Sequence, residues 1–210
     1  MPELVPLEGR FVHLLPLSRD HAADLLDVAL DDRGSFTLTP VPWDEASMVS
    51  YLERALAQRE AGQHLPYATW SVEGRRIVGT TRFYDLTSWD WSSMSAGREV
   101  ERPARRYDLA SIGYTWLHPS AQRTRINTEA KLLMMTEAFD QWNVVALHMQ
   151  TDARNARSRA AISRLGFTLD GVIRADKAAA DGAVRDSAVF TMTADEWPAN
   201  RARLTDRLAG

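Results

Sequence analysis

The chain has 210 residues, of which 45% are hydrophobic and 25% charged, and its formal net charge is −3. This length suits one domain, and the charge balance gives no support for non-specific nucleic-acid binding. The absence of cysteine excludes disulfides, thiolate metal sites and a cysteine nucleophile. No signal-peptide pattern and no apolar run of membrane-spanning length is evident, so we expect one cytoplasmic domain over residues 1–210.

Hydrophobic periodicity predicts a mixed α/β order of elements. Segments with strand character cover residues 11–15, 67–72, 76–84, 107–117, 144–150, 167–174 and 185–193. Apolar residues at helical spacing predict helices over residues 18–29, 44–61, 127–142 and 155–165, and a short polar helix after Trp197. Residues 87–106 are typical of a long surface loop. The order predicts an α/β (α+β) fold with one central sheet of about six to seven strands and about four flanking helices.

The segment between the fourth and fifth predicted strands has the pattern of an anion site. A polar, basic run follows the fourth strand and leads into the acidic first turn of a buried helix at residues 127–129. The free N–H groups and partial positive charge of a helix N-terminus suit a phosphate, and Gln122, Arg123 and Arg125 add polar and cationic groups. A solvated basic turn that binds nothing has the same pattern, so this segment alone leaves both interpretations open.

A second pattern lies downstream, where Asn155 and Ser158 begin a predicted helix with a glycine stop at residues 165–167. Together with the turn, it resembles the GNAT superfamily of acyl-CoA N-acyltransferases and, within it, the RimJ/RimL branch. Residues 122–127 match the family's Q/R-x-x-G-x-G/A turn at the first position, although Arg125 and Asn127 replace its glycines. Residues 128–130 match the T-E-A run of that branch, and the order of elements agrees from residue 11 to residue 192.

The resemblance implies a site for acetyl-CoA as co-substrate. In GNAT proteins a bulged strand splays from the next one and opens a slot for pantetheine, so we expect the splay between the fourth and fifth strands. Backbone groups of Tyr114, Trp116 and Leu117 are expected at the thioester and pantetheine, although both aromatic side chains also suit core packing. Asn155 would hydrogen-bond the pantetheine arm, a role compatible with N-capping. The pyrophosphate turn would consist of Gln122, Arg123, Thr124, Arg125, Ile126, Asn127 and Thr128.

Acetyl transfer to an amine needs a deprotonated nucleophile and a proton for the departing thiolate. Many GNAT enzymes use a tyrosine for the second task, at the position that Ile162 occupies here. Ser158 is the candidate donor in its place, with a helix-surface serine as the alternative. Members of the branch often carry a glutamate base where this chain has Ser111. The remaining base candidates are Asp85, Asp108 and His118, and a water-mediated route or no dedicated base stays open.

Aromatic residues in the segments expected beside the acceptor slot predict a partly apolar acceptor pocket: Trp43, Trp70, Phe83, Tyr84, Trp89 and Trp91. Core packing is the favoured alternative for Trp70 and Phe83, and Trp89 and Trp91 also suit a homodimer interface. The five histidines are scattered, so we expect no metal site. We expect no nucleic-acid or membrane partner.

The resemblance predicts transfer of an acetyl group from acetyl-CoA to a primary amine, either a protein N-terminus or a small molecule, by direct attack in a ternary complex. A catalytically inactive acyl-CoA-binding protein is the alternative, because the tyrosine and the strand glutamate are absent. A protein that has kept the fold but lost CoA binding is a third interpretation. Side chains at the two glycine positions can block the approach of a phosphate to the backbone.

Overall fold

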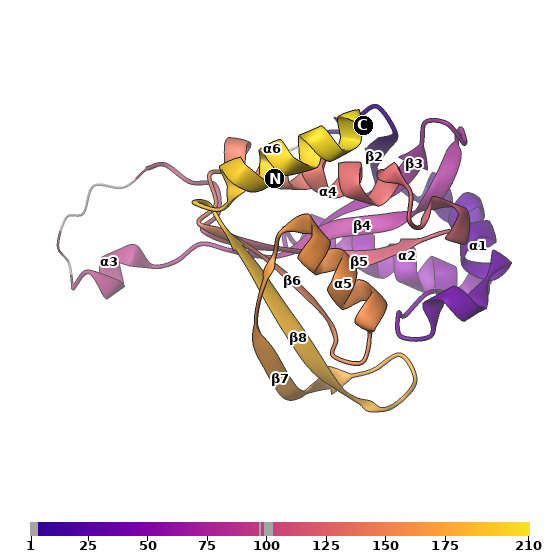
Figure 1. Ribbon diagram of the computed structural model, residues 1–210. Helices are drawn as coiled ribbons and strands as arrows, with labels where there is room; N and C mark the ends of the chain where they lie inside the picture. The colour runs from indigo at the N-terminus through magenta and orange to yellow at the C-terminus, as the bar shows by residue number, and fades with distance from the viewer. Residues whose placement is uncertain (1–3, 97, 99–102) are drawn as a thin grey trace.

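The computed structural model describes residues 4–96, 98 and 103–210. Its eight strands form one sheet in the order β1-β2-β3-β4-β5-β6-β8-β7 (Figure 1). The strands are β1 (Leu7–Glu8), β2 (Val12–Pro16), β3 (Leu65–Ser71), β4 (Arg76–Thr87), β5 (Leu109–Leu117), β6 (Ala146–Asp152), β7 (Thr168–Ala178) and β8 (Val184–Thr193). The α-helices are α1 (Ala22–Asp31), α2 (Glu45–Glu60), α3 (Trp91–Met94), α4 (Arg125–Thr136), α5 (Ala156–Leu165) and α6 (Trp197–Ala209).

The mixed α/β prediction is confirmed, since the seven predicted strands correspond to β2 through β8. The additional strand β1 has two residues, which is too short to show a hydrophobic period. Helix α4 begins at Arg125, two residues earlier than predicted, because the Thr124 hydroxyl caps the Ile126 N–H at 3.2 Å. A short π-helical segment (Glu137–Gln141) continues it. Helix α3 lies within the predicted loop and apart from the sheet (Figure 1).

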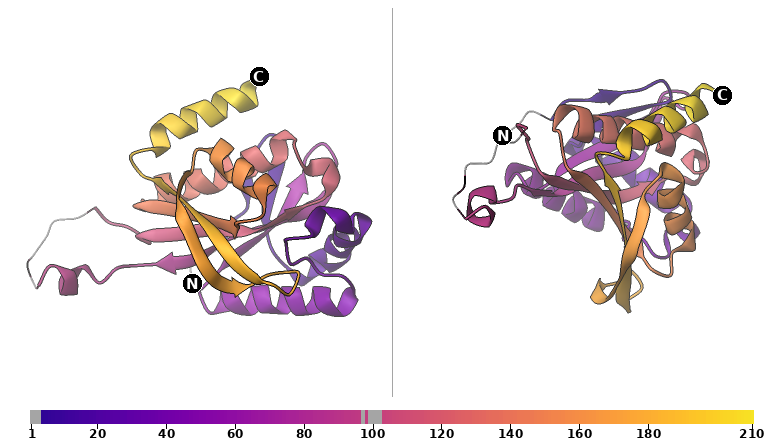
Figure 2. Two further views of the ribbon diagram at one scale, coloured as in Figure 1. Left: turned by 60° about the horizontal axis from the view of Figure 1, so that its bottom comes forward. Right: turned by 60° about the vertical axis from the view of Figure 1, so that its left-hand side comes forward.

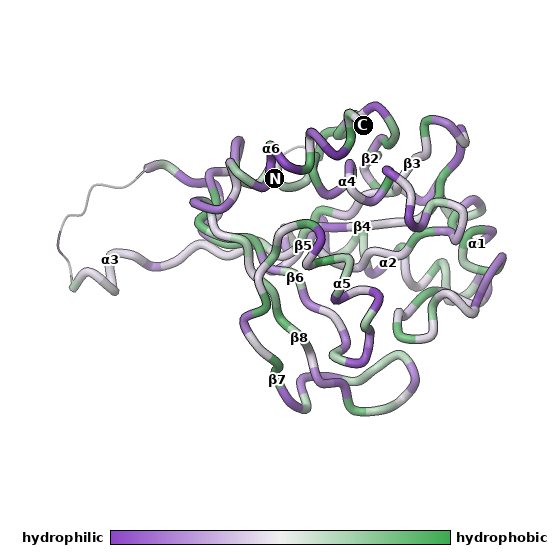
Figure 3. The backbone as a smooth tube through the Cα atoms, viewed as in Figure 1, coloured by the Kyte–Doolittle hydropathy of each residue, from purple (hydrophilic) through white to green (hydrophobic). Residues whose placement is uncertain are grey.

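Helices cover both faces of the sheet (Figure 2). Helices α1 and α2 bury Leu25, Val28 and Leu52 in a cluster on one face. Helices α4, α5 and α6 contribute to the larger cluster on the other face, which includes Met134 and Leu204. Figure 3 shows hydrophobic residues along the central strands and an alternation with hydrophilic residues along α6. The sheet is therefore a buried layer between two sets of helices.

The sheet parts between β5 and β6. These strands pair in parallel only at Leu109–Ala146, Ala110–Leu147 and Ser111–His148, although both continue beyond these positions. The predicted splay between these two strands is confirmed. Their facing backbone groups past this point have no ladder partner across the gap, so an extended ligand can occupy the place of a strand.

Strand β5 carries a β-bulge beside the gap. It has one more residue than β4 between the pairs Thr80–Trp116 and Arg82–Gly113. Within the bulge Tyr114 has a φ of 51°, a left-handed conformation that is uncommon for a residue with a bulky side chain. The bulge changes the direction of the side chains and backbone groups of β5. It does so at the point where β5 no longer pairs with β6.

A buried carboxylate ties α4 to the N-terminal strands. Glu129, in the T-E-A run, is only 7% exposed and accepts the backbone N–H groups of Arg10 (2.9 Å), Phe11 (2.6 Å) and Val12 (2.9 Å). A Cβ at Gly9 would lie 2.5 Å from the Glu129 carboxyl group, so only glycine fits there. In this structure the motif glutamate fastens β2 to the central helix.

Candidate active site

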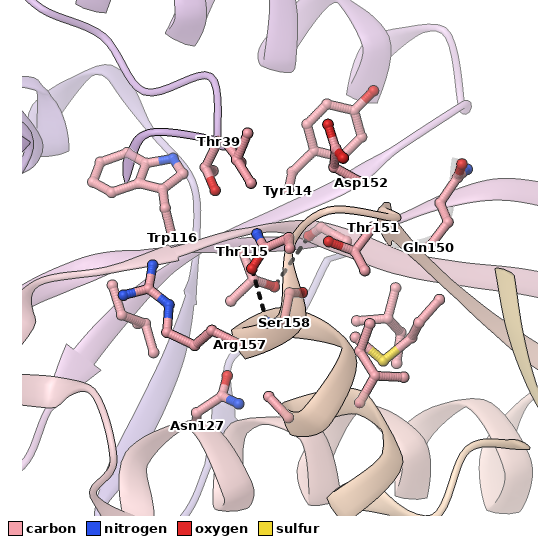
Figure 4. Close-up of a pocket in the computed structure, with 18 of the residues that line it drawn as sticks. Thr39, Tyr114, Thr115, Trp116, Asn127, Gln150, Thr151, Asp152, Arg157 and Ser158 are labelled. Carbon is pink, nitrogen blue, oxygen red and sulfur yellow. Dashed lines mark hydrogen bonds between the residues drawn. The ribbon is translucent and has the colours of Figure 1, made fainter. Parts of the chain in front are cut away.

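A cavity of about 800 Å³ lies where β5 and β6 part. Its walls come from the end of β5, the turn before α4, the first turns of α5, the end of β6 and the segment after the 3₁₀ helix η2 (Arg33–Phe36). Figure 4 shows Trp116, Thr115, Asn127 and Ser158 around it, with Gln150 and Asp152 at the β6 side. The cavity therefore joins both faces of the sheet.

The predicted β5 residues all line the cavity. Trp116 is 3% exposed and packs edge-on against Phe36 at 6.1 Å and Tyr51 at 6.2 Å, so core packing and cavity lining coincide for its side chain. Tyr114 is 46% exposed and lies over the Arg82 guanidinium at 4.2 Å. The Leu117 carbonyl accepts from Gln122 Nε2 at 2.9 Å, which joins the end of β5 to the turn.

The turn between β5 and α4 presents five of its seven predicted residues to the cavity: Gln122, Arg123, Thr124, Asn127 and Thr128. The other two point elsewhere. The Arg125 guanidinium lies 5.1 Å from the centre of the Phe11 ring, and Ile126 packs against the core. The side chain of Arg125 therefore does not fill the space beside the turn where a pyrophosphate would bind. The Thr124 hydroxyl caps one N–H of α4, and helix geometry leaves those of Arg125 and Asn127 without intrahelical partners.

The first turn of α5 is held by the predicted asparagine. Asn155 Oδ1 accepts the Ser158 N–H at 2.9 Å, so Asn155 is the N-cap residue, and both residues line the cavity. Arg157 connects this helix to the turn through Gln122 Oε1 at 3.2 Å and to the carbonyl of Ser35 in η2. Three walls of the cavity are thus joined by one guanidinium.

Two of the predicted catalytic residues lie away from the cavity. Asp108 accepts the backbone N–H of Trp89 at 2.7 Å and the Trp91 indole N–H at 3.0 Å, so it anchors the start of the β4–β5 connection. His118 has both ring nitrogens engaged, because Nδ1 accepts the Ser120 N–H at 3.1 Å and Nε2 lies 2.7 Å from Asp31. Neither is among the residues that line the cavity, so its geometry gives no support to their predicted roles as acid or base.

The alternative base candidate Asp85 is also outside the cavity lining, where it is exposed and accepts from Ser111 Oγ at 3.3 Å. Ser158 is the predicted catalytic residue that the structure does bring to the cavity. Ile162, at the position of the family's tyrosine, lines it as well.

Sequence reasoning missed the two buried charged residues of the cavity. Asp152 is 2% exposed and accepts from Arg154 Nη2 at 2.7 Å and Nε at 3.0 Å, and these bonds lower the pKa of its carboxyl group. Lys131 is 1% exposed and donates to the hydroxyls of Thr81 and Thr115. The sequence signal for Lys131 was a lysine among apolar residues in a helix predicted to be buried.

One of the six predicted acceptor-pocket aromatics lines the cavity. Tyr84 does so because Gly113 leaves room for its ring, since a Cβ at Gly113 would lie 2.8 Å from Tyr84 Cε1. Burial raises the pKa of Tyr84 to about 12, so its hydroxyl keeps its proton. The others lie elsewhere: Phe83 and Trp70 pack with the two cores, Trp43 is 68% exposed, and the rings of Trp89 and Trp91 lie 5.0 Å apart, tilted by 59°, in the β4–β5 connection.

The charges of the cavity are mostly positive. Arg123, Arg157, Arg164 and Arg207 gather on the α4–α5 side, and Asp152 is the acidic residue among the described lining. This field suits a ligand with several phosphates. Within the described residues no group of His, Asp and Glu side chains has the arrangement of a metal site. None of the described helices is long and apolar enough to cross a membrane.

Comparison with known proteins agrees with this geometry. Residues 12–168 match the model of the acetyltransferase (GNAT) domain family. No curated protein matches the chain. Among solved structures, a GCN5-related N-acetyltransferase from Brucella melitensis has a TM-score of 0.81 at 24% identity, covering 99% of this chain and 86% of that one.

Two further solved structures with the same fold are named RimJ and RimL. RimJ of Mycobacterium smegmatis, in complex with CoA-disulfide, has a TM-score of 0.74 at 21% identity, covering 93% of this chain and 88% of its own. RimL, a ribosomal L7/L12 α-N-protein acetyltransferase in complex with coenzyme A, has a TM-score of 0.70 at 15% identity, covering 91% and 99%. The family match, the parted sheet and the cationic turn together lead to one conclusion: the chain belongs to the GNAT acetyltransferase family and is an acetyl-CoA-dependent N-acetyltransferase.

Proposed function

We propose that this protein transfers the acetyl group of acetyl-CoA to a primary amine by direct attack in a ternary complex. The observation that carries the proposal is the cavity between β5 and β6, whose walls come from both faces of the sheet. Two substrates can therefore meet there from opposite sides. A covalent acetyl-enzyme has little support, because the chain has no cysteine and no histidine is among the described lining residues.

The walls on the α4–α5 side are the proposed cofactor site. The N–H groups at the start of α4 would bind the pyrophosphate, together with Gln122, Arg123 and Thr124. The backbone of β5 from Tyr114 to Leu117 would run beside the pantetheine arm. Of the seven turn residues, Arg125 and Ile126 would contribute through their backbone, since their side chains point away. Asn155 would face the arm while it caps α5, and the Ser158 hydroxyl would donate a hydrogen bond to the sulfur without transferring its proton.

The acceptor side favours amines that lose their proton easily. Asp152 is bound by Arg154 and its pKa is lowered, so it stays ionised and is a weak base. With no free carboxylate in the described lining, the acceptor would lose its proton to water. An α-amino group, with an ordinary pKa near 7.8, is then favoured over a lysine ε-amino group near 10.4. We propose a protein or peptide N-terminus as the acceptor, with small-molecule amines as the broader class.

The test is steady-state CoA release with a panel of amines at pH 7. Peptides with a free α-amine and blocked lysines should react several hundredfold faster than peptides with a blocked N-terminus and a free lysine, which is roughly the ratio of their neutral fractions. Turnover of the lysine peptides at equal rates would refute the acceptor class. Saturable acetyl-CoA binding without turnover of any amine would support the alternative, a catalytically inactive acyl-CoA-binding protein, which is motivated by the absence of the family's tyrosine at Ile162 and of the strand glutamate at Ser111.

We further propose that residues 1–210 act as one domain, since the described strands form one sheet. We propose a cytoplasmic location, which suits a chain without cysteine. A second copy is the proposed protein partner, because the edge strand β7 exposes Leu169, Val172 and Ile173. Light scattering after size-exclusion chromatography measures the molecular mass at high protein concentration and after 100-fold dilution. A monomer mass at both concentrations would refute the dimer.

A further inference from the structure

Lys131 is an unusual basic residue in this chain. The sequence has two lysines, Lys131 and Lys177, among 25 basic residues, and the others are arginines. Lys131 lies on α4, is 1% exposed, and lines the cavity between β5 and β6. Its Nζ donates to Thr81 Oγ1 at 2.6 Å and to Thr115 Oγ1 at 2.8 Å. Thr115 belongs to the bulge of β5, so the ammonium lies directly behind the bulged segment.

The ammonium has a donor to spare and no anionic partner. An ammonium has three N–H groups, and the two hydroxyls accept two of them. In the part of the chain that the structure describes, no carboxylate contacts Nζ. A buried cation without an anion is unfavourable, so such a group is usually paired or functional. The missing partner can come from the ligand that fills the cavity.

Burial lowers the pKa of Lys131 to about 7. No charged neighbour contributes to this shift, although Asp152 on β6 and Arg157 and Arg164 on α5 line the same cavity. The group can therefore exist in both protonation states near neutral pH. Arginine cannot do this, which distinguishes Lys131 from the arginines that line the α4–α5 side.

We propose that Lys131 is the proton donor to the CoA thiolate, held by Thr81 and Thr115 behind the bulge with its third N–H aimed at the sulfur. This inference rests on the direct acetyl transfer proposed above. When the amine attacks the carbonyl carbon, the C–S bond breaks and its electron pair stays on sulfur. Lys131 then gives one proton to sulfur, which forms the CoA thiol, and the acceptor nitrogen loses one proton to water. The neutral Lys131 amine regains a proton from solvent, so the cycle closes.

The two-lysine sequence permits a direct test by nuclear magnetic resonance. In protein labelled with ¹³C,¹⁵N-lysine, the side-chain signals are assigned with the Lys177→Met variant, which removes the other lysine. Lys177 also lines the cavity but does not contribute to the pKa shift of Lys131, so the titration of Lys131 should be unchanged. The titration is followed in the free protein, with CoA, and with a CoA analogue that lacks the sulfur atom. We expect the titration of Lys131 to differ between CoA and the analogue, because only CoA carries the sulfur that exchanges a proton with Lys131. Equal titration with both ligands would overturn the proposal.

Kinetics give a second readout. Lys131→Met should lower kcat about a hundredfold while the KM for acetyl-CoA changes less than threefold, as expected for a proton donor. Lys131→Arg keeps the charge and should retain folding, yet should stay slow because a guanidinium does not release its proton. Wild-type kcat in Lys131→Arg would overturn proton donation. Absence of CoA binding would refute both proposals, whereas a sulfur-dependent titration without turnover of any amine would refute only the acceptor proposal.

Discussion

Replacing Glu129 tests whether the T-E-A run stabilises the fold rather than the chemistry. Its carboxylate accepts three backbone N–H groups, of which the Val12 N–H is buried and those of Arg10 and Phe11 are partly buried. In Glu129→Ala the buried donor loses about 2 kcal/mol, and the two others regain water and lose about 1 kcal/mol each. The expected loss of unfolding free energy is therefore about 4 kcal/mol. Glu129→Gln keeps one acceptor oxygen and should lose about half of that.

Urea unfolding followed by circular dichroism measures this loss, with the m-value as a check that the same structure unfolds. Glu60→Ala is the matched control, because Glu60 is exposed at the end of α2 and should change stability by less than about 0.5 kcal/mol. Glu129 does not line the cavity, so the folded fraction should keep its activity within about threefold. A loss of stability below about 1 kcal/mol in Glu129→Ala, or inactivity of the folded variant, would refute the reasoning.

Three further predictions follow from contacts around the cavity. Gly113→Ala places a Cβ 2.8 Å from Tyr84 Cε1, so the ring must move, and the KM for the acceptor should rise about tenfold while calorimetry finds unchanged CoA binding. Arg157→Ala breaks the links of α5 to the turn and to η2, and should weaken CoA binding about tenfold by the same calorimetry. Burial, followed by the nearby Arg82 charge, lowers the pKa of His64 to about 4, so the unfolded chain binds more protons than the folded one between about pH 6.5 and 4. Stability should fall as pH drops through that window, and a His64→Gln variant with the same slope would contradict this account.

The sequence was most informative where a local pattern sets the structure. The capped α5 was predicted correctly, because capping residues and hydrophobic periods act over a few neighbouring residues. The parting of β5 and β6 was also predicted correctly, from the family resemblance. The left-handed Tyr114 could not be predicted, since bulge positions depend on the partner strand. The two-residue β1 forms only through its pairing with β2.

The site was harder to predict, because side-chain direction depends on tertiary contacts. His118 and Asp108 have suitable chemistry, yet each faces a partner that sequence spacing does not reveal, Asp31 in one case and the Trp89 backbone in the other. Arg125 was expected to crowd the turn, and only the proximity of Phe11 shows where it goes instead. The sequence does not distinguish Lys131 from its neighbours in the helix. Its place in the cavity depends on hydrogen bonds to two threonines from different strands.

The sheet consists of two parts, β1–β5 and β6–β8, and only three residue pairs between β5 and β6 join them. The two parts can therefore separate more easily than other neighbouring strands. A ligand that fills the gap adds the missing hydrogen bonds and acts as a removable strand. Its binding energy then adds to the cohesion of the whole molecule, by about 2.7 kcal/mol when the ligand is at a hundred times its Kd. Amide exchange along both strands should slow in proportion. The lifetime of this enzyme is thereby coupled to the supply of its own co-substrate.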